Sequence, residues 1–513
     1  MINAIGRDIP DYIDGFGPVK PFQGAFAAIP DLSAYAPPLK VAQPGHRKVV
    51  KNLEDLFKHL RIENGMTLSF HHHLRNGDAV ANLVLDTAAK LGLKDLSVSL
   101  TGVFAIHAPL IEHIKNGVVT SLRSSGLYGP LATAVSSGLM AKPVLLHSHG
   151  GRPRSLKTGE LKIDVAFIAA PAADNYGNIN GLTGPAACGS LGYAFGDADY
   201  ASTVVAVTDN LVDYPLIPAS ITQNKVDYVV RVDSIGDPQG IVSGTTRITK
   251  DPVGLKIADT AARVIQASGL LKDGFSFQTG AGGASLAAAH YVSRMMEKDQ
   301  IAGSFALGGI TGYMVDMLEK GMFKSIFDVQ SFDLESVQSL GRNRNHIEVS
   351  ADLYANHFNA GSLVNNLDVV ILGATEIDTD FNVNVITGSD GVIMGASGGH
   401  PDTAAGARMT IIVTNLLRSR QSIVVDRVVT ATTPGETVDV LVTEYGVAVN
   451  PARQNLKERF VDAGLNVKDI NELKRLAMNI AGIPDRIENT GRIVALVEYR
   501  DGTIIDVVRA NSC

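Results

Sequence analysis

The spacing of apolar residues changes in a regular way along the chain from residue 49 onward. The segment LSVSL at 96–100 alternates apolar and polar positions as a strand does, whereas DAVANLVLDTAAKLGL at 78–93 repeats its apolar residues every three or four positions as a helix does. The same pattern predicts further helices at 49–60, 108–117 and 131–140, and strands at 66–71, 118–122 and 142–147. Strands that alternate with helices of about 10–15 residues indicate a parallel sheet. The chain is therefore expected to have an α/β fold.

The second part of the chain repeats the first. Three pairs of segments match in the same order: 67–86 with 274–293, 111–122 with 315–326, and 163–180 with 367–384. In the last pair Asp164, Val165, Ala170, Asp174, Asn178 and Asn180 meet the identical residues Asp368, Val369, Ala374, Asp378, Asn382 and Asn384. These matches predict two tandem homologous halves, 48–225 and 226–513, with a cleft between them. Pockets are common at such interfaces.

Composition and charge narrow the possible partners and location. The formal net charge of −7 gives no electrostatic attraction for nucleic acid or for an anionic membrane. Two cysteines, Cys188 and Cys513, are too few for a disulfide framework and are typical of a reducing compartment. The first residues carry acidic side chains rather than a signal peptide, and no apolar run reaches the roughly 18 residues of a membrane span. We expect a cytoplasmic protein whose Pro- and Gly-rich residues 1–47 form an extended arm on a partner surface.

Two glycine-rich turns follow strands of the second half. In SFALGGITGYMVD at 304–316 an apolar strand runs into Gly308, Gly309 and Gly312 without a carboxylate, lysine, histidine or cysteine up to residue 314. In QTGAGGAS at 278–285 an imperfect dinucleotide fingerprint has Ser285 where its third glycine belongs. Backbone N–H groups at such turns hold an anion or a developing oxyanion, although a plain tight turn explains them equally well. The candidate residues are Gly282, Gly283, Ser285, Gly309 and Gly312.

Basic and histidine-rich turns occupy the matching places in the first half. HHHLRNGD at 71–78 offers His72, His73 and Arg75 as a cradle for a carboxylate, or serves only for packing and helix capping. A zinc site is not expected, because neighbouring residues of a strand point to opposite faces. HSHGGRPR at 147–154 adds His149 and Arg152, which supply positive charge for an anion or form a solvated loop.

Three further groups follow strands near the repeat ends. The amides of Asn178, Asn180, Asn382 and Asn384 suit a carbonyl or amide ligand, or cap turns. Glu376 and Glu444 are the carboxylates best placed for a base, or belong to structural ion pairs. In GASGGHPD at 395–402 the loop of Gly398, Gly399 and His400 lets a ligand approach, whereas the pattern G-x-S-x-G makes Ser397 a less favoured nucleophile.

Several of these motifs together resemble one family. The stretches are SFHHHLRNGD, HSHGGR, DNYGNINGLTG, CGSLGYA, FSFQTGAGGASLA, FALGGITGYMVD, DVQSFD, EIDTDFNVNVITGSDG, GASGGHPDTA and VDVLVTEYGVAVNPAR, in order from about 69 to 453. They are similar to the coenzyme A transferase superfamily and, within it, to the citrate lyase alpha subunit. The resemblance implies two tandem CoA-transferase-like αβα halves with parallel-rich sheets. Nothing is carried over to the first 45 residues, which match poorly.

The resemblance also implies a reaction: citrate exchanges with the acetyl group of an acyl carrier protein thioester, and acetate is released. In relatives that act on acetate or hydroxybutyrate, a strand ending in Leu-Gly leads to a nucleophilic glutamate, which falls here on Gly312. The family therefore implies direct attack by a citrate carboxylate through a mixed anhydride, without a glutamyl-thioester enzyme intermediate. Oxyanion donors then come from backbone amides around 280–285 and 308–312, and His72, Arg75 and Arg152 hold the citrate charges.

The resemblance further implies partners: a citrate lyase beta subunit and a small acyl carrier protein (gamma) with a CoA-like prosthetic group, in a homo-oligomeric complex that serves citrate fermentation. No metal, nucleic acid, membrane or tightly bound cofactor is expected, and CoA or acetyl-CoA would act as a surrogate. An alternative is a glutamate-dependent acyl-CoA:carboxylate transferase or acyl-CoA hydrolase that uses Glu376 or Glu444. A non-catalytic ligand sensor is less favoured, because no output domain is evident.

Overall fold

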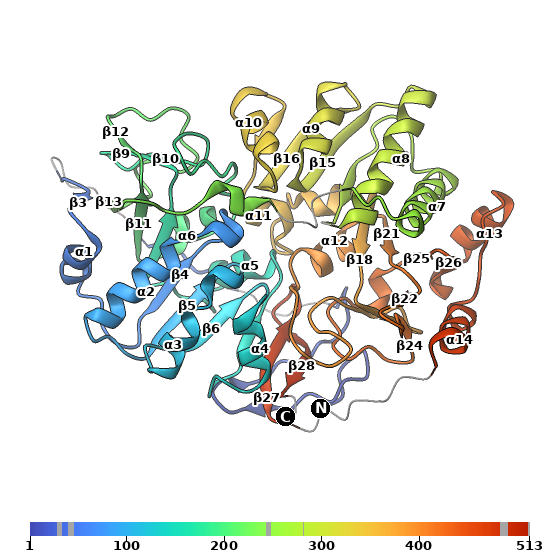
Figure 1. Cartoon of the computed structure of the whole chain (residues 1–513), viewed down its shortest axis with the longest axis horizontal. Coiled ribbons are helices and arrows are strands. Elements are labelled where there is room, and N and C mark those ends of the chain that lie inside the picture. The colour runs from blue at the N-terminus through green and yellow to red at the C-terminus, as the bar shows by residue number, and fades with distance from the viewer. Residues whose placement is uncertain (28–32, 39–45, 243–247, 281, 483–490, 511–513) are drawn as a thin grey trace.

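Two large sheets with helices on their faces make up most of the molecule (Figure 1). The computed structural model describes residues 1–27, 33–38, 46–242, 248–280, 282–482 and 491–510. The mixed α/β architecture with mainly parallel strands confirms the fold class expected from the apolar pattern.

The first sheet has ten strands, and most of its neighbouring strands are parallel. Their order is β28 (Ile504–Arg509), β27 (Ile493–Glu498), β7 (Val144–Leu146), β6 (Val119–Ser124), β5 (Leu96–Leu100), β4 (Thr67–Phe70), β8 (Val165–Ala169), β11 (Thr203–Thr208), β13 (Tyr228–Arg231) and β3 (Val49–Val50). Helices α1 (Leu53–Leu60), α2 (Val80–Lys90), α3 (Leu110–Lys115), α4 (Pro130–Ser136), α5 (Gly151–Lys157) and α6 (Ala194–Tyr200) accompany it.

The second sheet has eight strands in a matching arrangement. Their order is β17 (His346–Glu348), β16 (Phe323–Ser331), β15 (Gly303–Ile310), β14 (Phe277–Thr279), β18 (Val369–Gly373), β21 (Met409–Val413), β25 (Val440–Thr443) and β26 (Gly446–Val449). Its helices are α7 (Pro252–Ser268), α8 (Gly283–Asp299), α9 (Gly312–Glu319), α10 (Leu334–Arg342), α11 (Ala351–Ala355), α12 (His400–Gly406), α13 (Gln454–Asp462) and α14 (Ile470–Ala481). From β7 to β13 the strands succeed one another across the first sheet as those from β17 to β25 do across the second.

Small sheets repeat the same correspondence. Strands β9 (Ala172–Asp174), β10 (Ile179–Asn180) and β12 (Leu211–Val212) form one, and β19 (Glu376–Asp378), β20 (Val383–Asn384) and β24 (Val424–Val425) form the other. Two short hairpins complete the described strands: β1 (Tyr12–Ile13) with β2 (Gly17–Pro18), and β22 (Leu417–Arg418) with β23 (Gln421–Ser422).

The elements expected between 49 and 147 are confirmed, with one difference at their start. Residues 49–50 form the edge strand β3, and the helix begins only at Leu53. The side chain of Asn52 accepts a hydrogen bond from the N–H of Asp55 and so caps the helix at that point. The periodic apolar residues therefore begin before the helix does, because the cap at Asn52 fixes where the helix starts.

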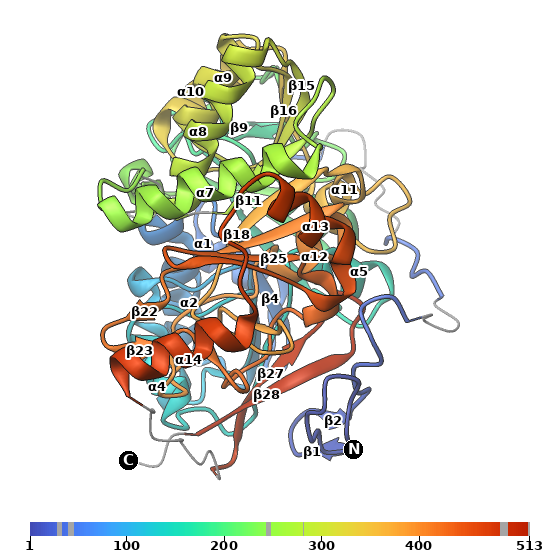
Figure 2. The same ribbon diagram turned by 90° about the vertical axis from the view of Figure 1, so that its right-hand side faces the viewer.

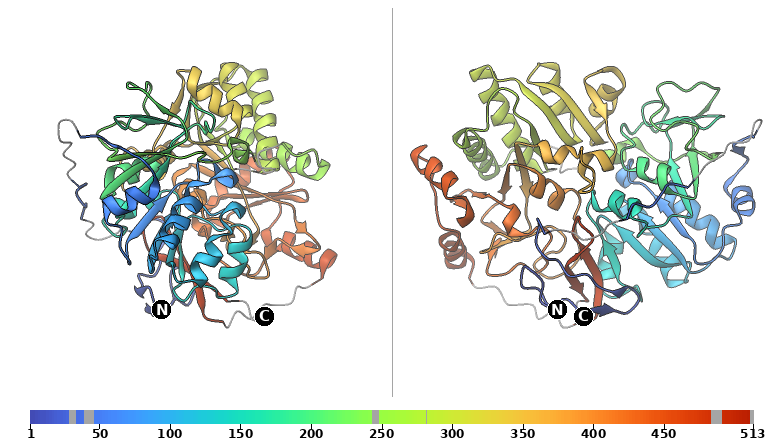
Figure 3. Two further views of the ribbon diagram at one scale, coloured as in Figure 1. Left: turned by 60° about the vertical axis from the view of Figure 1, so that its left-hand side comes forward. Right: turned by 180° about the vertical axis from the view of Figure 1, so that it is seen from behind.

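The C-terminal strands join the first sheet rather than the second. Strand β27 pairs with β7, and β28 pairs with β27, although both lie in the segment expected to belong to the second half. Figure 1 and the right panel of Figure 3 show these red strands beside the cyan elements of the first sheet. Strand β13 also belongs to the first sheet, beyond the expected boundary at residue 225. Sheet membership thus departs from the expected division at both places, because pairing between distant segments leaves no local pattern.

The N-terminal arm packs against its own chain where it is described. The N–H of Phe22 donates to the carbonyl of Ile504, and the side chain of Asn3 donates to the carbonyl of Ile505. Arg7 forms an ion pair of 3.1 Å with the buried carboxylate of Asp506. Figure 2 shows β1 and β2 next to β28. The described part of the expected arm therefore contacts β28 of its own chain, and its placement on a partner surface stays a prediction; residues 28–32 and 39–45 lie outside the described part.

Other expectations from composition are answered only in part. Cys188 is buried and free, and Cys513 lies outside the described residues. Within the part of the chain that the structure describes, no helix is both long enough and apolar enough to cross a membrane.

Candidate functional site

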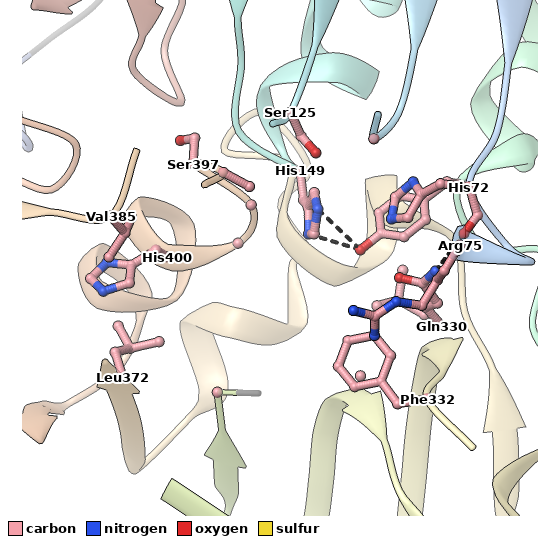
Figure 4. Close-up of a pocket in the computed structure, with 18 of the residues that line it drawn as sticks. His72, Arg75, Ser125, His149, Gln330, Phe332, Leu372, Val385, Ser397 and His400 are labelled. Carbon is pink, nitrogen blue, oxygen red and sulfur yellow. Dashed lines mark hydrogen bonds between the residues drawn. The ribbon is translucent and has the colours of Figure 1, made fainter. Parts of the chain in front are cut away.

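One pocket of about 290 Å³ lies where loops from the carboxyl ends of the strands of both sheets converge (Figure 4). The loops after β4, β5, β6 and β7 contribute from the first sheet, and the ends of β14, β15, β16 and β18 contribute from the second. The carboxyl ends of parallel strands are the usual place for ligand binding in α/β sheets. The topology therefore brings segments some 200 residues apart to one site.

Arg75 enters the pocket from the turn that follows β4. Its guanidinium carbon lies 4.7 Å from the ring centroid of Phe332 and 5.5 Å from that of Phe104. Its Nη1 is buried and has no hydrogen-bond partner among the described residues. The backbone φ of +51° lies in the left-handed region, which costs a non-glycine residue about 1–2 kcal/mol. Arg75 is thus held between two rings with a donor free for a ligand.

Three aromatic side chains form a stack beside Arg75. The ring of His72 lies 4.9 Å from that of Tyr193, and the Tyr193 hydroxyl lies 2.8 Å from Nδ1 of His149. Nδ1 of His72 lies 2.5 Å from the hydroxyl of Thr101. These contacts fix both imidazoles and the phenol at the pocket wall, where each still offers a polar atom.

The second sheet supplies amide and hydroxyl groups to the opposite wall. Nε2 of Gln278 donates to the hydroxyl of Tyr354 at 2.9 Å, whereas Oε1 of Gln278 has no partner among the described residues. Nε2 of Gln330 donates to the backbone carbonyl of His72 at 2.8 Å and so ties β16 to the loop of the first sheet. The hydrogen bond from Gln330 therefore joins the two sheets at the pocket itself.

The loop before α12 completes the pocket. The N–H of His149 donates to the carbonyl of Gly398, and a side chain at Gly399 would collide with the Tyr354 hydroxyl. Nδ1 of His400 lies 2.7 Å from the Thr433 hydroxyl, and Nε2 lies 2.9 Å from the carbonyl of Gly373. Both ring nitrogens are thus engaged, so His400 does not serve as the base for Ser397, and the pair required of a serine hydrolase is not formed. Gly398 and Gly399 line the pocket, and their role in ligand approach stays a prediction.

The charge of the pocket favours an anion. No Asp or Glu is among the described residues that line it, and Arg75 is the only Arg or Lys among them. Burial lowers the pKa of His149 to about 3 and that of His400 to about 4, because a charged imidazole loses its hydration there. Burial, and then His149, also hold the pKa of His72 well below its usual range. The pocket at neutral pH therefore presents one guanidinium, neutral imidazoles and hydroxyls.

Two predicted ligands of the first half lie outside the pocket. Arg152 is buried, and its Nη2 bonds Asp197 at 2.8 Å and the hydroxyl of Ser69 at 2.7 Å. The side chain of His73 is buried and stacks on His71 at 5.5 Å. Asp197 in turn lies 3.1 Å from His71. This network supports the loop that carries His72 and Arg75. The charge of Arg152 is already paired with Asp197, so Arg152 does not bind a ligand.

The asparagine pairs and the two glutamates take structural roles in the described chain. Asn178 and Asn382 donate to Asp174 and Asp378 within their own turns, Asn180 donates to the carbonyl of Pro218, and Asn384 bonds Glu376. Glu376 also accepts from the N–H of Val429, and Glu444 accepts from the N–H of Leu416. None of these six residues lines the pocket. The turn-capping alternative describes the asparagines, whereas the two glutamates accept hydrogen bonds from N–H groups and form no ion pair with a described residue.

Only some residues of the two glycine-rich turns line the pocket. Gly280 and Gly309 line the pocket, whereas Gly282, Gly283 and Ser285 lie at the start of α8 without lining it, and Ala281 is outside the described residues. The N–H of Gly312 donates to Asp333 at 2.7 Å, and a side chain at that position would meet Glu335. Gly312 therefore faces α10, and the space expected there for a substrate carboxylate is not part of the pocket.

Several pocket residues were not among the predicted site residues. Tyr193 lies in the CGSLGYA stretch, and Gln278 precedes the glycine turn. Their position beside a motif was the only feature of the sequence that could have indicated a place in the pocket. Phe332 lies in the DVQSFD stretch, whereas Tyr354 lies in a segment without a noted motif. Their place in the pocket depends on how the second sheet packs against the first.

Comparison with known proteins gives a consistent result. The family model for the alpha subunit of citrate lyase matches residues 46–511. The citrate lyase alpha chain of Escherichia coli (strain K12) is 53% identical over 462 residues, which cover 90% of this chain and 91% of that one. The citrate lyase alpha chain of Klebsiella pneumoniae is 49% identical over 491 residues, 96% of each chain.

Solved structures extend the likeness to three dimensions. A crystal structure described as the alpha subunit of citrate lyase from Streptococcus mutans in complex with citrate is 50% identical, covers 100% of both chains and has a TM-score of 0.96. A Pseudomonas malonate decarboxylase hetero-tetramer contains a chain that is 17% identical, with a TM-score of 0.65 over 86% of this chain and 88% of that one. At that identity the second likeness concerns the fold alone.

Proposed function

This chain belongs to the citrate lyase alpha subunit family, and on that premise we propose how it carries out the acyl transfer of that enzyme. The reaction converts acetyl-S-carrier and citrate into citryl-S-carrier and acetate. One thioester is exchanged for another, so little net free energy is required. The chain has to position the two reactants and to stabilise the charge that develops on the thioester oxygen.

The observation that carries the mechanism is the lack of Asp and Glu among the described residues of a pocket that holds a free guanidinium donor. A carboxylate of citrate, placed by Arg75, attacks the acetyl carbonyl and forms a mixed anhydride as the C–S bond breaks. The released thiolate then attacks the citryl carbonyl, and acetate leaves with the bridging oxygen. The substrate thus supplies the nucleophile that a glutamate supplies in covalent catalysis.

Neutral donors in the pocket suit the oxyanion. Burial raises the pKa of Tyr193 well above its usual range, so its hydroxyl stays protonated near neutral pH. The backbone of Gly309 also lines the pocket wall, whereas the N–H of Gly280 already donates to the carbonyl of Ile371 at 2.7 Å. Arg75 accounts for one carboxylate of citrate, and His72 is placed to donate to another, while His149 orients the hydroxyl of Tyr193.

The remaining parts of the proposal concern assembly. The partners are a beta subunit and an acyl carrier protein whose CoA-like prosthetic group delivers the thioester, in a homo-oligomeric cytoplasmic complex, without a cofactor bound tightly to this chain. The shared strand order of the two sheets supports descent from tandem homologous halves, with the pocket in the cleft between them.

A single-turnover isotope experiment tests the chemistry. Protein in excess over acetyl-CoA, as surrogate carrier thioester, is mixed with citrate labelled with ¹⁸O in its carboxylates, and the acetate is analysed by mass spectrometry. Direct attack places one label in acetate in the first turnover. A glutamate-dependent transferase that uses Glu376 or Glu444 would release unlabelled acetate and leave a borohydride-sensitive enzyme thioester. A sensor would give no citryl thioester at all.

A further inference from the structure

A second cavity, of about 430 Å³, lies on the first sheet away from the pocket. It is lined by the first residue of β4 and by the middle of β5, whereas the pocket lies past the carboxyl ends of these strands. Hydroxyl groups on the sheet face line its floor, and charged residues from β6 and from the segment before β8 line its walls. The residues used below are Ser97, Ser121, Arg123, Glu160 and Lys162.

Arg123 is the central group of this cavity. Its side chain is partly buried and makes no hydrogen bond or close ion pair with another described residue. The carboxylates that face it, Glu160 and Glu498, are both bound by Arg154, at 2.8 Å and 3.2 Å. Burial lowers the pKa of Arg123, because its charge is removed from water without a direct partner. The guanidinium is thus desolvated and its donors are free.

The other polar groups of the cavity are also available. Ser99 on the floor already accepts a hydrogen bond from Arg152, but the hydroxyls of Ser97 and Ser121 bond no other described residue. Lys162 stands at the exposed rim, where its ammonium lies 5.7 Å from the Tyr35 ring. Glu160 is the acidic group of the lining, and it shares the guanidinium of Arg154 with Glu498. The lining groups without a bonded partner among the described residues include the cations Arg123 and Lys162 and the hydroxyls of Ser97 and Ser121.

We propose that this second cavity is a binding site for a small oxyanion, a carboxylate or a phosphate, held by the guanidinium of Arg123. The planar fork of arginine matches the paired oxygens of either group. Ser97 and Ser121 donate from the floor, and Lys162 adds positive charge at the rim. The site is separate from the transfer pocket and shares none of its lining residues.

Calorimetric titration of the full-length protein tests this assignment. Inorganic phosphate and acetate are titrated separately into wild type, Arg123→Gln and Ser121→Leu, which fills the cavity without touching the charge. Arg344→Gln, at an exposed arginine, is the matched control, and Arg75→Gln reports binding in the transfer pocket. Loss of a charged hydrogen bond predicts an affinity weakened on the order of tenfold or more in Arg123→Gln and Ser121→Leu. Arg344→Gln should keep the wild-type affinity, whereas Arg75→Gln should lose only the acetate bound in the transfer pocket and keep the binding that depends on Arg123.

Each outcome decides the proposal. Selective binding of phosphate or of acetate, lost with Arg123 or by filling the cavity, supports the site and identifies its preferred anion. Binding that survives both changes, or that disappears only in Arg75→Gln, overturns the proposal. It is equally overturned if neither anion binds wild type up to about 10 mM, since affinities weaker than that give too little free energy for a built site. Circular dichroism of each variant shows that the fold is kept, and if Arg123→Gln does not fold, Ser121→Leu alone decides.

Discussion

The guanidinium of Arg75, from the first sheet, lies over the ring of Phe332, from the second, with 4.7 Å between the guanidinium carbon and the ring centroid. Phe332 follows the last residue of β16, and Arg75 follows β4. The contact therefore couples the position of the main cation of the pocket to the packing of one sheet against the other. Attraction of a cation by a ring face contributes about 0.5–2 kcal/mol, depending on desolvation.

Replacing Arg75 should weaken use of citrate. Arg75→Ala removes the charged hydrogen bonds to a carboxylate, which are worth about 1.5–3 kcal/mol, so kcat/KM for citrate should fall roughly ten- to a hundredfold. Arg75→Lys keeps the charge but loses the planar fork and should recover only part of the activity. Steady-state transfer from acetyl-CoA measures this, with Arg344→Ala as the control at an exposed arginine. A wild-type kcat/KM in Arg75→Ala would remove Arg75 from the site.

Gly309 should be intolerant of a side chain although its backbone is not left-handed. A Cβ built there would lie 2.2 Å from the ring of Phe332, whereas one built at Gly373, which also lines the pocket, meets nothing within 4 Å. Gly309→Ala should therefore displace the ring that supports Arg75 and cost about 1–3 kcal/mol of unfolding free energy. Urea denaturation of both variants measures the difference. Equal losses in Gly309→Ala and Gly373→Ala would show that the contact with Phe332 is not responsible.

The sequence predicted those parts of the molecule that follow from local pattern. Strand and helix order between 49 and 147, and the pocket positions of His72, Arg75, His149 and His400, were recognised because each lies in a distinctive turn directly after a strand. Parallel strands place such turns at one edge of a sheet. No contact had to be known for that inference.

The remainder depended on contacts between distant segments. Arg152 was predicted to bind a ligand because its partner Asp197, on another helix, is not evident from the sequence. Gly312 was predicted to leave space for a substrate because Glu335, on the helix that follows, is equally hidden in the sequence. The asparagines carry a signal for turn capping that is identical to one for ligand binding, since the same amide serves both. Phe332 reaches the pocket only through the packing of the second sheet, which no local period encodes.

The buried imidazole of His149 should make the protein sensitive to acid. Its pKa is about 3 when folded, below the ordinary value of about 6.5, so its stabilising contribution is complete above pH 6.5 and is lost as the pH falls toward 3. At about pH 5 the unfolded chain binds this proton and the folded chain does not, which costs about 2 kcal/mol. His149→Gln, which stays neutral, should lose about that much less stability between pH 7 and pH 5 than wild type.

Urea denaturation at the two pH values measures that difference, with His290→Gln beside it to show the effect of removing an exposed histidine. The neutral variant keeps a group that can bond the Tyr193 hydroxyl, so the comparison isolates the charge. Equal losses of unfolding free energy in His149→Gln and wild type would contradict the prediction.

Tyr193 should affect the chemical step more than substrate binding. Its hydroxyl is bonded to His149 and its ring is stacked on His72, so Tyr193→Phe removes the oxygen and keeps the packing. If the phenol donates to the oxyanion of the attacked thioester, that bond strengthens only in the transition state, and kcat should fall by about 10²–10³ with little change in KM for citrate. If it only orients His149, then His149→Gln should reproduce most of the loss, and the double variant should be no worse than either single one. The hydroxyl of Tyr193 is identified as the donor if kcat falls further in Tyr193→Phe than in His149→Gln, and if the double variant is slower than His149→Gln alone. In that case the loss in Tyr193→Phe does not come from the orientation of His149.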